Sequence, residues 1–157
     1  MRIGFGYDVH AFAANRRLVL GGVEIPHSEG LLGHSDADVL THAIMDSLLG
    51  AAALGDIGKH FPDTDSEFKD INSLVLLKKT ADILSNAGFK VNNIDSTIAA
   101  QVPKLAPYIE EMRKKISSSL EIDISAVSIK ATTTEKLGFE GRKEGISAYS
   151  VCTIIQK

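Results

Sequence analysis

Asp8 and His10 place a carboxylate and an imidazole two positions apart near the N-terminus. In a β-strand, side chains two residues apart project from the same face, so both groups can converge on one ion. Carboxylate oxygens and imidazole nitrogens are good zinc ligands, and a site with three protein ligands leaves one position open for a substrate. An Asp-x-His pair by itself is more often structural, so the prediction of a metal site needs a third ligand.

His42 is the candidate third ligand. It lies four residues from both Asp38 and Asp46, so the three side chains form one polar stripe on a predicted helix. A carboxylate that accepts the second ring N–H of a metal-bound histidine fixes its orientation, which makes Asp38 and Asp46 candidate partners of His42. A solvated helix face is the more common origin of such a stripe. His27 and His60 lack these surroundings, and we expect both to be structural or exposed.

Two other segments suit phosphate binding. Gly33–Asp36 precedes the predicted helix, whose free N–H groups form a natural anion site to which His34 and Ser35 add donors. Thr132–Lys136 follows a predicted strand, and there Glu135 could hold a hard cation such as magnesium against a diphosphate. The alternatives are a simple N-cap turn at Gly33–Asp36 and a capping box at Thr132–Lys136.

Three loops carry weaker signals. Gly55–Gly58 and Phe61–Asp65 combine flexible backbone with carboxylates, which suits recognition of a polyol, although most such loops only turn the chain. Ala99–Leu105 ends a strand at a proline-fixed bend, where backbone N–H and C=O groups could pair with the edge of a base.

The elements that must position these residues follow from hydrophobic periodicity and turn residues. We expect strands over residues 1–10, 89–101, 127–133 and 146–155, and a hairpin of residues 17–20 and 23–25 around Gly21-Gly22. We expect helices from an N-cap at Ser35 or Asp36 to about residue 53, over residues 73–86, and from Pro107 to about residue 120. Residues 26–33 and 55–70 are expected to be loops. This irregular order favours an α+β fold with the helices on one face of a sheet.

The last predicted strand bears on assembly, because both of its faces are low in charge. Helices would cover the face of Ile146, Ala148, Ser150, Cys152 and Ile154. The face of Ser147, Tyr149, Val151, Thr153 and Ile155 would then meet a subunit partner, or alternatively internal loops.

Composition limits the class of protein. The 157 residues, of which 44% are hydrophobic and 24% charged, predict one ordinary globular domain over residues 1–157. A net charge of −3 without a long basic run argues against a nucleic-acid partner. Cys152 is the single cysteine, no targeting segment is visible, and no apolar run approaches the roughly 20 residues of a membrane helix. We therefore expect a cytoplasmic protein without a membrane partner.

Five segments occur together in one order: Gly6–His10, Gly33–Val39, Gly55–Gly58, Phe61–Asp65 and Thr132–Phe139. With them the chain closely resembles the 2-C-methyl-D-erythritol 2,4-cyclodiphosphate synthases over almost its whole length. The resemblance implies one cyclodiphosphate synthase domain and a homotrimer with active sites between subunits. It implies a phosphorus–oxygen lyase of the methylerythritol-phosphate route to isoprenoids. In 4-diphosphocytidyl-2-C-methyl-D-erythritol 2-phosphate, the 2-phosphate attacks the β-phosphorus and CMP leaves.

The resemblance also implies roles for residues. Asp8, His10 and His42 match ligands of zinc or another divalent transition metal, and Glu135 matches the residue that holds magnesium or manganese with the diphosphate. His34 and Thr133 match positions assigned to transition-state stabilisation. The implied substrate contacts are Asp8, His10, His34, Ser35, Asp56, Gly58, Phe61, Asp63, Asp65, Ala100, Pro103, Lys104, Leu105, Ala106, Thr132, Thr133, Glu135, Phe139 and Arg142. Phe139 and Arg142 also match positions near a central trimer cavity, which in some members binds an isoprenoid diphosphate.

One departure from the family lies at the start of a helix. Many members have Ala-Asp-Ser where this chain has Ile71-Asn72-Ser73, and asparagine caps a helix nearly as well as aspartate. Two competing functions share the same ligands: a metal-dependent phosphodiesterase, which would release a hydrolysed product, and a non-enzymatic isoprenoid- or nucleotide-binding module, which would bind without turnover.

Overall fold

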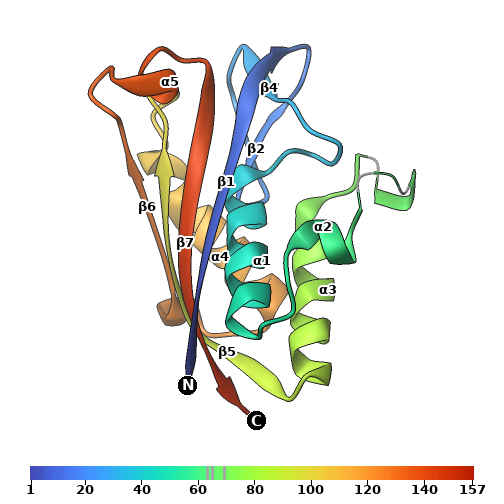
Figure 1. Cartoon of the computed structure of the whole chain (residues 1–157). Coiled ribbons are helices and arrows are strands. Elements are labelled where there is room, and N and C mark those ends of the chain that lie inside the picture. The colour runs from blue at the N-terminus through green and yellow to red at the C-terminus, as the bar shows by residue number, and fades with distance from the viewer. Residues whose placement is uncertain (63, 65, 69) are drawn as a thin grey trace.

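A computed structural model describes residues 1–62, 64, 66–68 and 70–157. Within these residues, five strands form one sheet in the order β4-β1-β7-β5-β6 (Figure 1). The strands are β1 (Arg2–Ala14), β4 (Glu29–Leu31), β5 (Phe89–Ala99), β6 (Val127–Thr132) and β7 (Gly145–Gln156). β5 and β6 are parallel, and the other neighbours are antiparallel. The carboxyl ends of β1, β5 and β6 therefore lie at the same end of the sheet.

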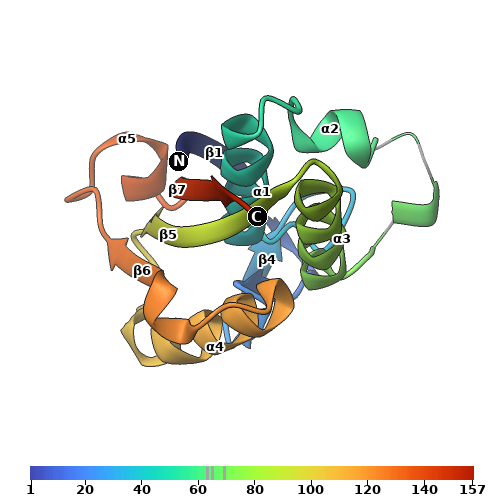
Figure 2. The same cartoon turned by 90° about the horizontal axis from the view of Figure 1, so that it is seen from below.

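The helices lie mainly on one side of this sheet. They are α1 (Val39–Ala51), α2 (Ile57–His60), α3 (Ser73–Asn86), α4 (Ile109–Leu120) and α5 (Gly138–Gly141), with 3₁₀ turns at Ser66–Phe68, Ala106–Tyr108 and Ile124–Ala126. Viewed along the strands, α1, α3 and α4 lie on one side and α5 on the other (Figure 2). A separate hairpin, β2 (Leu18–Leu20) and β3 (Val23–Ile25), turns at Gly21 and Gly22, both with positive φ. The α+β fold is as predicted, and α1, α3 and α4 lie on one face as expected, whereas α5 lies on the other.

α1 packs unusually close to β1 because two glycines of β1 face it. A Cβ at Gly4 would lie 1.9 Å from the carbonyl oxygen of Ser47, and one at Gly6 would lie 2.0 Å from that of Ala43. No side chain fits in either place, so the helix backbone rests directly on the strand. The next two residues of β1 on this face are Asp8 and His10.

The strand β7 confirms one half of the prediction about its faces. Ile146, Ala148, Ser150, Cys152 and Ile154 are all buried under the helices. On the other face, Tyr149 and Val151 are 39% and 40% exposed, and the neighbouring Phe5 of β1 is 63% exposed. Ser147 lies on this face too, but it is buried and donates a hydrogen bond to Glu140 of α5. The alternative that internal loops cover this face is wrong for Phe5, Tyr149 and Val151.

Several boundaries differ from the sequence-based expectation. β1 continues to Ala14 instead of ending at His10, and Glu29–Leu31, expected as a loop, pairs with its extension as β4. A three-residue strand has too little periodicity to be recognised. The expected loop of residues 55–70 contains α2 and a 3₁₀ turn, and β5 ends at Ala99.

α3 runs from Ser73 to Asn86, as predicted. Its start confirms that the asparagine at position 72 caps the helix. Asn72 is its N-cap, and the side-chain oxygen accepts a hydrogen bond from the backbone N–H of Leu74 at 2.9 Å. Gly88 follows the helix with φ of 82°. None of the helices in the described part of the chain is long and apolar enough to span a membrane.

Candidate metal centre

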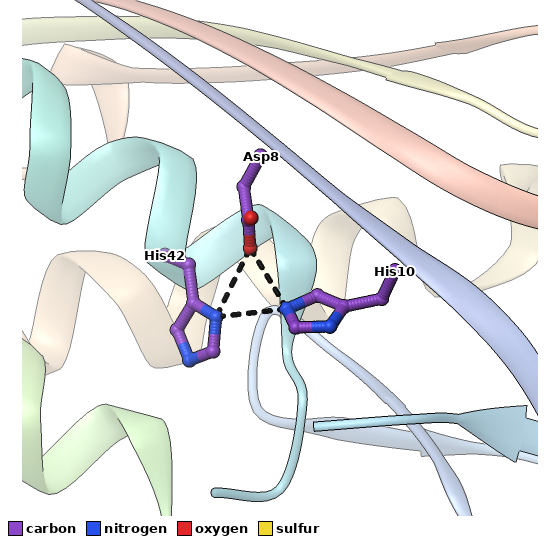
Figure 3. Close-up of side chains that lie close together, drawn as sticks. All are labelled: Asp8, His10 and His42. Atoms are coloured by element: carbon purple, nitrogen blue, oxygen red, sulfur yellow. Dashed lines mark hydrogen bonds and ion pairs between the residues drawn. The ribbon is translucent and has the colours of Figure 1, made fainter. Parts of the chain in front are cut away.

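Asp8 and His10 in the second half of β1 meet His42 near the start of α1 (Figure 3). Asp8 Oδ2 lies 3.0 Å from His10 Nε2 and 3.0 Å from His42 Nδ1, and the two ring nitrogens are 3.3 Å apart. In a tetrahedral zinc site with metal–ligand distances near 2.0–2.1 Å, two ligand atoms are about 3.3 Å apart. The three atoms thus form one face of such a tetrahedron, and their chemistry and spacing fit a divalent metal.

The backbone explains why these side chains meet. Asp8 and His10 point to the α1 side of the sheet because β1 is extended through both residues. His42 lies in the first turns of α1, next to Ala43, whose carbonyl oxygen rests on Gly6. The close approach of α1 to β1 therefore brings the His42 ring within reach of Asp8.

The hydrogen bonds of the two rings are consistent with the metal-binding tautomers. His10 Nδ1 lies 2.6 Å from the carbonyl oxygen of Leu32, which can only accept, so Nδ1 carries a proton and Nε2 faces Asp8. His42 Nε2 lies 3.1 Å from the hydroxyl oxygen of Ser35 and 3.0 Å from that of Ser73. The remaining nitrogen, Nδ1, faces Asp8 and His10.

The prediction that Asp38 and Asp46 support His42 is wrong. Asp38 is the N-cap of α1 and is fully buried, and its carboxylate accepts hydrogen bonds from the backbone N–H groups of Gly21 (2.9 Å), Gly22 (2.7 Å) and Thr41 (3.0 Å). Asp46 accepts the N–H of Ile57 at 2.8 Å. Both carboxylates anchor neighbouring loops to α1, a use that spacing along the helix could not reveal.

The structure does not place a helix N-terminus at Gly33–Asp36, where an anion site is expected from the sequence. α1 begins at Val39, later than expected, and the Asp38 carboxylate already occupies its N-terminus. The N-cap expected at Ser35 or Asp36 is wrong too, because Asp38 caps α1. Asp36 points instead to the start of α3, where it accepts the backbone N–H of Ser73 at 2.9 Å.

Charge at the centre favours metal binding. Burial by itself raises the pKa of Asp8, but the hydrogen bonds and positive charge of His10 and His42 outweigh it and lower that pKa to about 2. For His10, burial lowers the pKa, yet its bond to Asp8 outweighs burial and the pKa is raised. Asp8 is therefore an anion at neutral pH, as a metal ligand must be.

A cavity of about 110 Å³ lies beside His42. It brings together several residues expected to contact substrate, namely His34, Ser35, Gly58 and Phe61. Its other lining residues are Ile57, from the Gly55–Gly58 segment named in the sequence, and Met45, Phe68 and Leu76, which sequence reasoning did not single out. Phe68 packs edge-on against Phe61, with ring centroids 5.6 Å apart. Met45, Phe68 and Leu76 look like ordinary core residues, so no signal in the sequence distinguished them.

Three further residues are expected at this part of the site: Asp56, Asp63 and Asp65. Asp56 caps α2, its carboxylate accepting the N–H of Lys59 at 3.0 Å. Asp63 and Asp65 lie outside the described residues.

The expected phosphate segment lies far across the sheet from the metal centre. Val9, Ser147, Ala99 and Thr132 are aligned in register across β1, β7, β5 and β6. Three strand spacings correspond to about 14 Å. Within one chain, Thr132 and the residues after it are therefore separated from Asp8 and His10, although the strand register places both groups at the same end of β5 and β6.

The Thr132–Lys136 turn is well defined. Thr133 donates its hydroxyl to the Glu135 carboxylate at 2.8 Å, and Glu135 and Lys136 both have left-handed backbone conformations. The N–H of Lys136 donates to the side-chain oxygen of Gln101 at 3.1 Å, which ties the turn to the segment after β5. The N-cap of α5 is Leu137, without a side-chain cap, so the capping-box alternative is wrong.

The other expected contacts surround this turn. The Ala100 N–H donates to the carbonyl oxygen of Thr132 at 3.0 Å, so residues 100–106 begin beside β6. Among them Leu105 is buried and Lys104 exposed, and the Val102–Pro103 peptide is cis. Phe139 lies in α5, and Arg142, its C-cap, forms an ion pair with Glu144 at 2.9 Å.

These features define a class of protein: an α+β domain with an Asp-His-His centre that fits a divalent metal, and a separate polar turn at the same end of the sheet. The chain belongs to the YgbB family, whose model matches residues 1–155. The family resemblance seen in the sequence is thereby confirmed.

Individual relatives agree. A protein of Syntrophomonas wolfei named 2-C-methyl-D-erythritol 2,4-cyclodiphosphate synthase is 66% identical over 156 residues, covering 99% of both chains. One of Clostridium botulinum with the same name is 62% identical over 157 residues, covering 100% of both.

Solved structures agree in fold. The bifunctional IspDF from Campylobacter jejuni has a TM-score of 0.96 and 47% identity over 99% of this chain, which spans only 42% of that longer protein. The CDP complex of IspF from Plasmodium falciparum has a TM-score of 0.87 and 37% identity, covering 99% of this chain and 96% of that one.

Proposed function

We propose that this chain is a phosphorus–oxygen lyase that catalyses the reaction of the relatives, in the methylerythritol-phosphate route to isoprenoids. It converts 4-diphosphocytidyl-2-C-methyl-D-erythritol 2-phosphate to 2-C-methyl-D-erythritol 2,4-cyclodiphosphate and CMP. The observation that carries the proposal is the Asp8–His10–His42 cluster, which combines ligand chemistry and tetrahedral spacing in a chain that is 66% identical to a synthase of that name.

The reaction needs no nucleophile from the protein. An oxygen of the substrate's 2-phosphate forms a bond to the β-phosphorus, while the bond between that phosphorus and the bridging oxygen breaks. The bridging oxygen leaves with CMP and keeps the electron pair. Both reacting groups are anionic, so the protein must align them and offset their charge.

We assign zinc to the Asp8–His10–His42 site, since two imidazoles and one carboxylate form a ligand set typical of it. A bound divalent metal supplies Lewis acidity and positive charge next to a phosphate. A second ion, magnesium or manganese, is assigned to Glu135, whose carboxylate is exposed and oriented by Thr133.

The chain's own residues hold the substrate. The cavity beside His42, with Gly58 and Phe61, suits the methylerythritol unit because its lining combines apolar side chains with the polar His34 and Ser35. His34 borders the same cavity and is assigned to donate to a phosphate oxygen there. Thr133 lies at the opposite turn and would donate to a phosphate oxygen once its hydroxyl leaves the Glu135 carboxylate. Residues 100–106 and Thr132 form the proposed cytidine and phosphate contacts.

We further propose that the active site lies between subunits of a homotrimer. Within one chain, three strand spacings, or about 14 Å, separate the Thr132–Lys136 turn from the metal centre. One substrate is therefore best held by the metal centre of one subunit and the Thr132–Lys136 turn of the next. The exposed apolar side chains on the open face of the sheet, Ile3, Phe5, Tyr7, Val9, Tyr149 and Val151, support such an interface. The number three, and a central cavity near Phe139 and Arg142 that binds an isoprenoid diphosphate, come from the resemblance.

Turnover of the diphosphocytidyl substrate with zinc and magnesium present, followed by phosphorus NMR, tests this function. We expect CMP and a cyclic diphosphate in equal amounts. Hydrolysed diphosphate products instead would indicate a phosphodiesterase, and binding without any product would indicate a binding module.

We also propose a cytoplasmic location. Cys152 is a free, buried thiol, which suits a reducing compartment.

A further inference from the structure

Ser73 links the metal-binding ring of His42 to a carboxylate on another segment. Ser73 is the first residue of α3 and is fully buried. Its hydroxyl oxygen lies 3.0 Å from His42 Nε2, and its hydroxyl also forms a short hydrogen bond to Asp36 Oδ1. A serine has one hydroxyl proton, and a carboxylate can only accept. The hydroxyl therefore donates to Asp36 and accepts the N–H of His42.

The direction of these two hydrogen bonds determines the tautomer of His42. In the neutral ring that binds a metal, a proton on Nε2 leaves a lone pair on Nδ1, the nitrogen that lies 3.0 Å from Asp8 and 3.3 Å from His10. Ser35 lies 3.1 Å from the same Nε2, but its hydroxyl oxygen also accepts the Ala37 N–H at 3.3 Å. Of the two serines, Ser73 is thus the one coupled to a negative charge.

Asp36 is itself held firmly. Its Oδ2 accepts the backbone N–H of Ser73 at 2.9 Å, and its Oδ1 accepts that of Asp38 at 3.2 Å. Its own N–H donates to the carbonyl oxygen of Ile71 at 3.2 Å. The carboxylate consequently keeps the start of α3 and the segment before α1 together behind the His42 ring.

We propose that Ser73 and Asp36 are positioning residues of the metal centre, forming a carboxylate–hydroxyl–imidazole relay that orients His42 and strengthens Nδ1 as a metal ligand. This rests on the metal centre of the proposed function. The group that holds the second nitrogen of a metal-bound histidine is usually a carboxylate, a backbone carbonyl or a water. Here the link runs through a serine of α3, which couples metal binding to the docking of that helix.

The test is zinc affinity of the metal-free full-length protein, measured by competition with a chromophoric chelator. Loss of a partner behind a metal ligand costs about 10- to 100-fold in affinity, and we expect Ser73→Ala to weaken zinc binding by that amount. Asp36→Asn keeps an acceptor for the Ser73 N–H but removes the charge, and should weaken binding in the same direction. Asn72→Ala is the matched control, because it removes the exposed cap of the same helix without touching His42, and should leave zinc affinity unchanged.

Replacing zinc with cobalt(II) gives a visible absorption spectrum, which a loss of folding stability alone does not change. We expect the visible absorption bands of the cobalt protein to shift in Ser73→Ala and Asp36→Asn but not in Asn72→Ala. If Ser73→Ala does not fold, as judged by circular dichroism, Asp36→Asn decides the question. In the double variant, Asp36→Asn should cause no further loss of affinity, because the relay is already broken.

Unchanged zinc affinity and cobalt spectra in both single variants would overturn the relay, while wild-type binding and turnover would leave the proposed function intact. Wild-type protein that binds no zinc would overturn the metal centre and the relay together. Loss in Ser73→Ala alone would restrict the role to the hydroxyl and overturn that of Asp36.

Discussion

The Asp8 carboxylate lies between two imidazoles, and its charge determines what the site can bind. With a pKa of about 2, Asp8 is ionised at neutral pH, and each ring presents to it the nitrogen that does not face a backbone carbonyl or a serine. The three ligand atoms lie within 3.3 Å of one another, which places them well around a cation.

Replacing His42 with alanine removes one of the three ligands and should abolish stoichiometric zinc binding and CMP release. The chain should still fold, because α1 keeps its apolar contacts and its Asp38 cap. Metal analysis measures zinc binding, circular dichroism measures folding, and a turnover assay measures CMP release. A zinc-free His42→Ala protein with full activity would disprove the assignment.

Cys152 should be almost unreactive in the folded protein. Burial raises the pKa of its thiol, and the side chain is 1% exposed. Thiolate is the nucleophile, so a raised pKa lowers the reactive fraction at every pH below it, and reactivity should increase as pH rises. At about pH 8, a disulfide reagent should label Cys152 only as denaturant unfolds the chain. Rapid labelling of native protein would contradict the burial.

At the scale of elements, the contact between α1 and β1 brings the ligands together. Gly4 and Gly6 let the carbonyl oxygens of Ser47 and Ala43 rest on the strand. Ala43 follows His42 on α1, and Gly6 precedes Asp8 on the same face of β1. The spacing between α1 and β1 therefore sets the distance between His42 and Asp8.

Gly6→Ala should therefore weaken both stability and metal binding. Its Cβ would lie 2.0 Å from the Ala43 carbonyl oxygen, so α1 must move away, at a cost of about 1–3 kcal/mol in the free energy of unfolding. Gly50→Ala is the control on the same helix, because its Cβ would meet its nearest atom, the Phe5 carbonyl oxygen, only at 3.9 Å. It should stabilise the helix by about 0.5–1 kcal/mol.

Chemical denaturation and zinc titration of both glycine variants measure these effects. A Gly6→Ala protein as stable as wild type and with the same zinc affinity would show that the close packing does not position His42.

At the scale of the whole molecule, the open face of the sheet and the distance between the two halves of the site point to assembly. Phe5 is 63% exposed and Val151 is 40% exposed, although both are apolar and lie on adjacent strands. A single chain leaves this surface in water, and a trimer would bury it.

Phe5→Asp should prevent assembly without unfolding the chain, because the side chain makes few contacts within its own subunit. We expect a monomer in analytical ultracentrifugation, a circular dichroism spectrum like that of wild type, and loss of turnover. A Phe5→Asp protein that keeps the wild-type mass and activity would exclude this face as the interface.

Mixed assemblies test whether the site is shared between subunits. His42→Ala and Glu135→Ala, each inactive at limiting magnesium, should regain activity when they are unfolded and refolded together. In a cyclic trimer assembled at random from equal amounts, roughly one quarter of the sites combine an intact metal centre with an intact Glu135 turn. Complete absence of recovery in confirmed mixed trimers would place the site within one chain.

Short sequence patterns predicted those parts of this protein whose geometry depends on residues close together in the sequence. Strand alternation placed Asp8 and His10 on one face, and the faces of β7 followed from the same period. Helix periodicity with a cap at Asn72 predicted α3 over Ser73–Asn86. In these cases the backbone repeat alone fixes the direction of each side chain.

Only the tertiary structure decided which distant groups meet. Asp38 and Asp46 are close to His42 along the helix, yet Ser73, 31 residues away in sequence, holds its ring. Phe68 completes the cavity, and Glu29–Leu31 becomes a strand because β1 extends beside it. Contacts of this kind depend on how α1, α3 and the sheet pack together. That packing balances the burial of many side chains at once, so no short stretch of the sequence contains it.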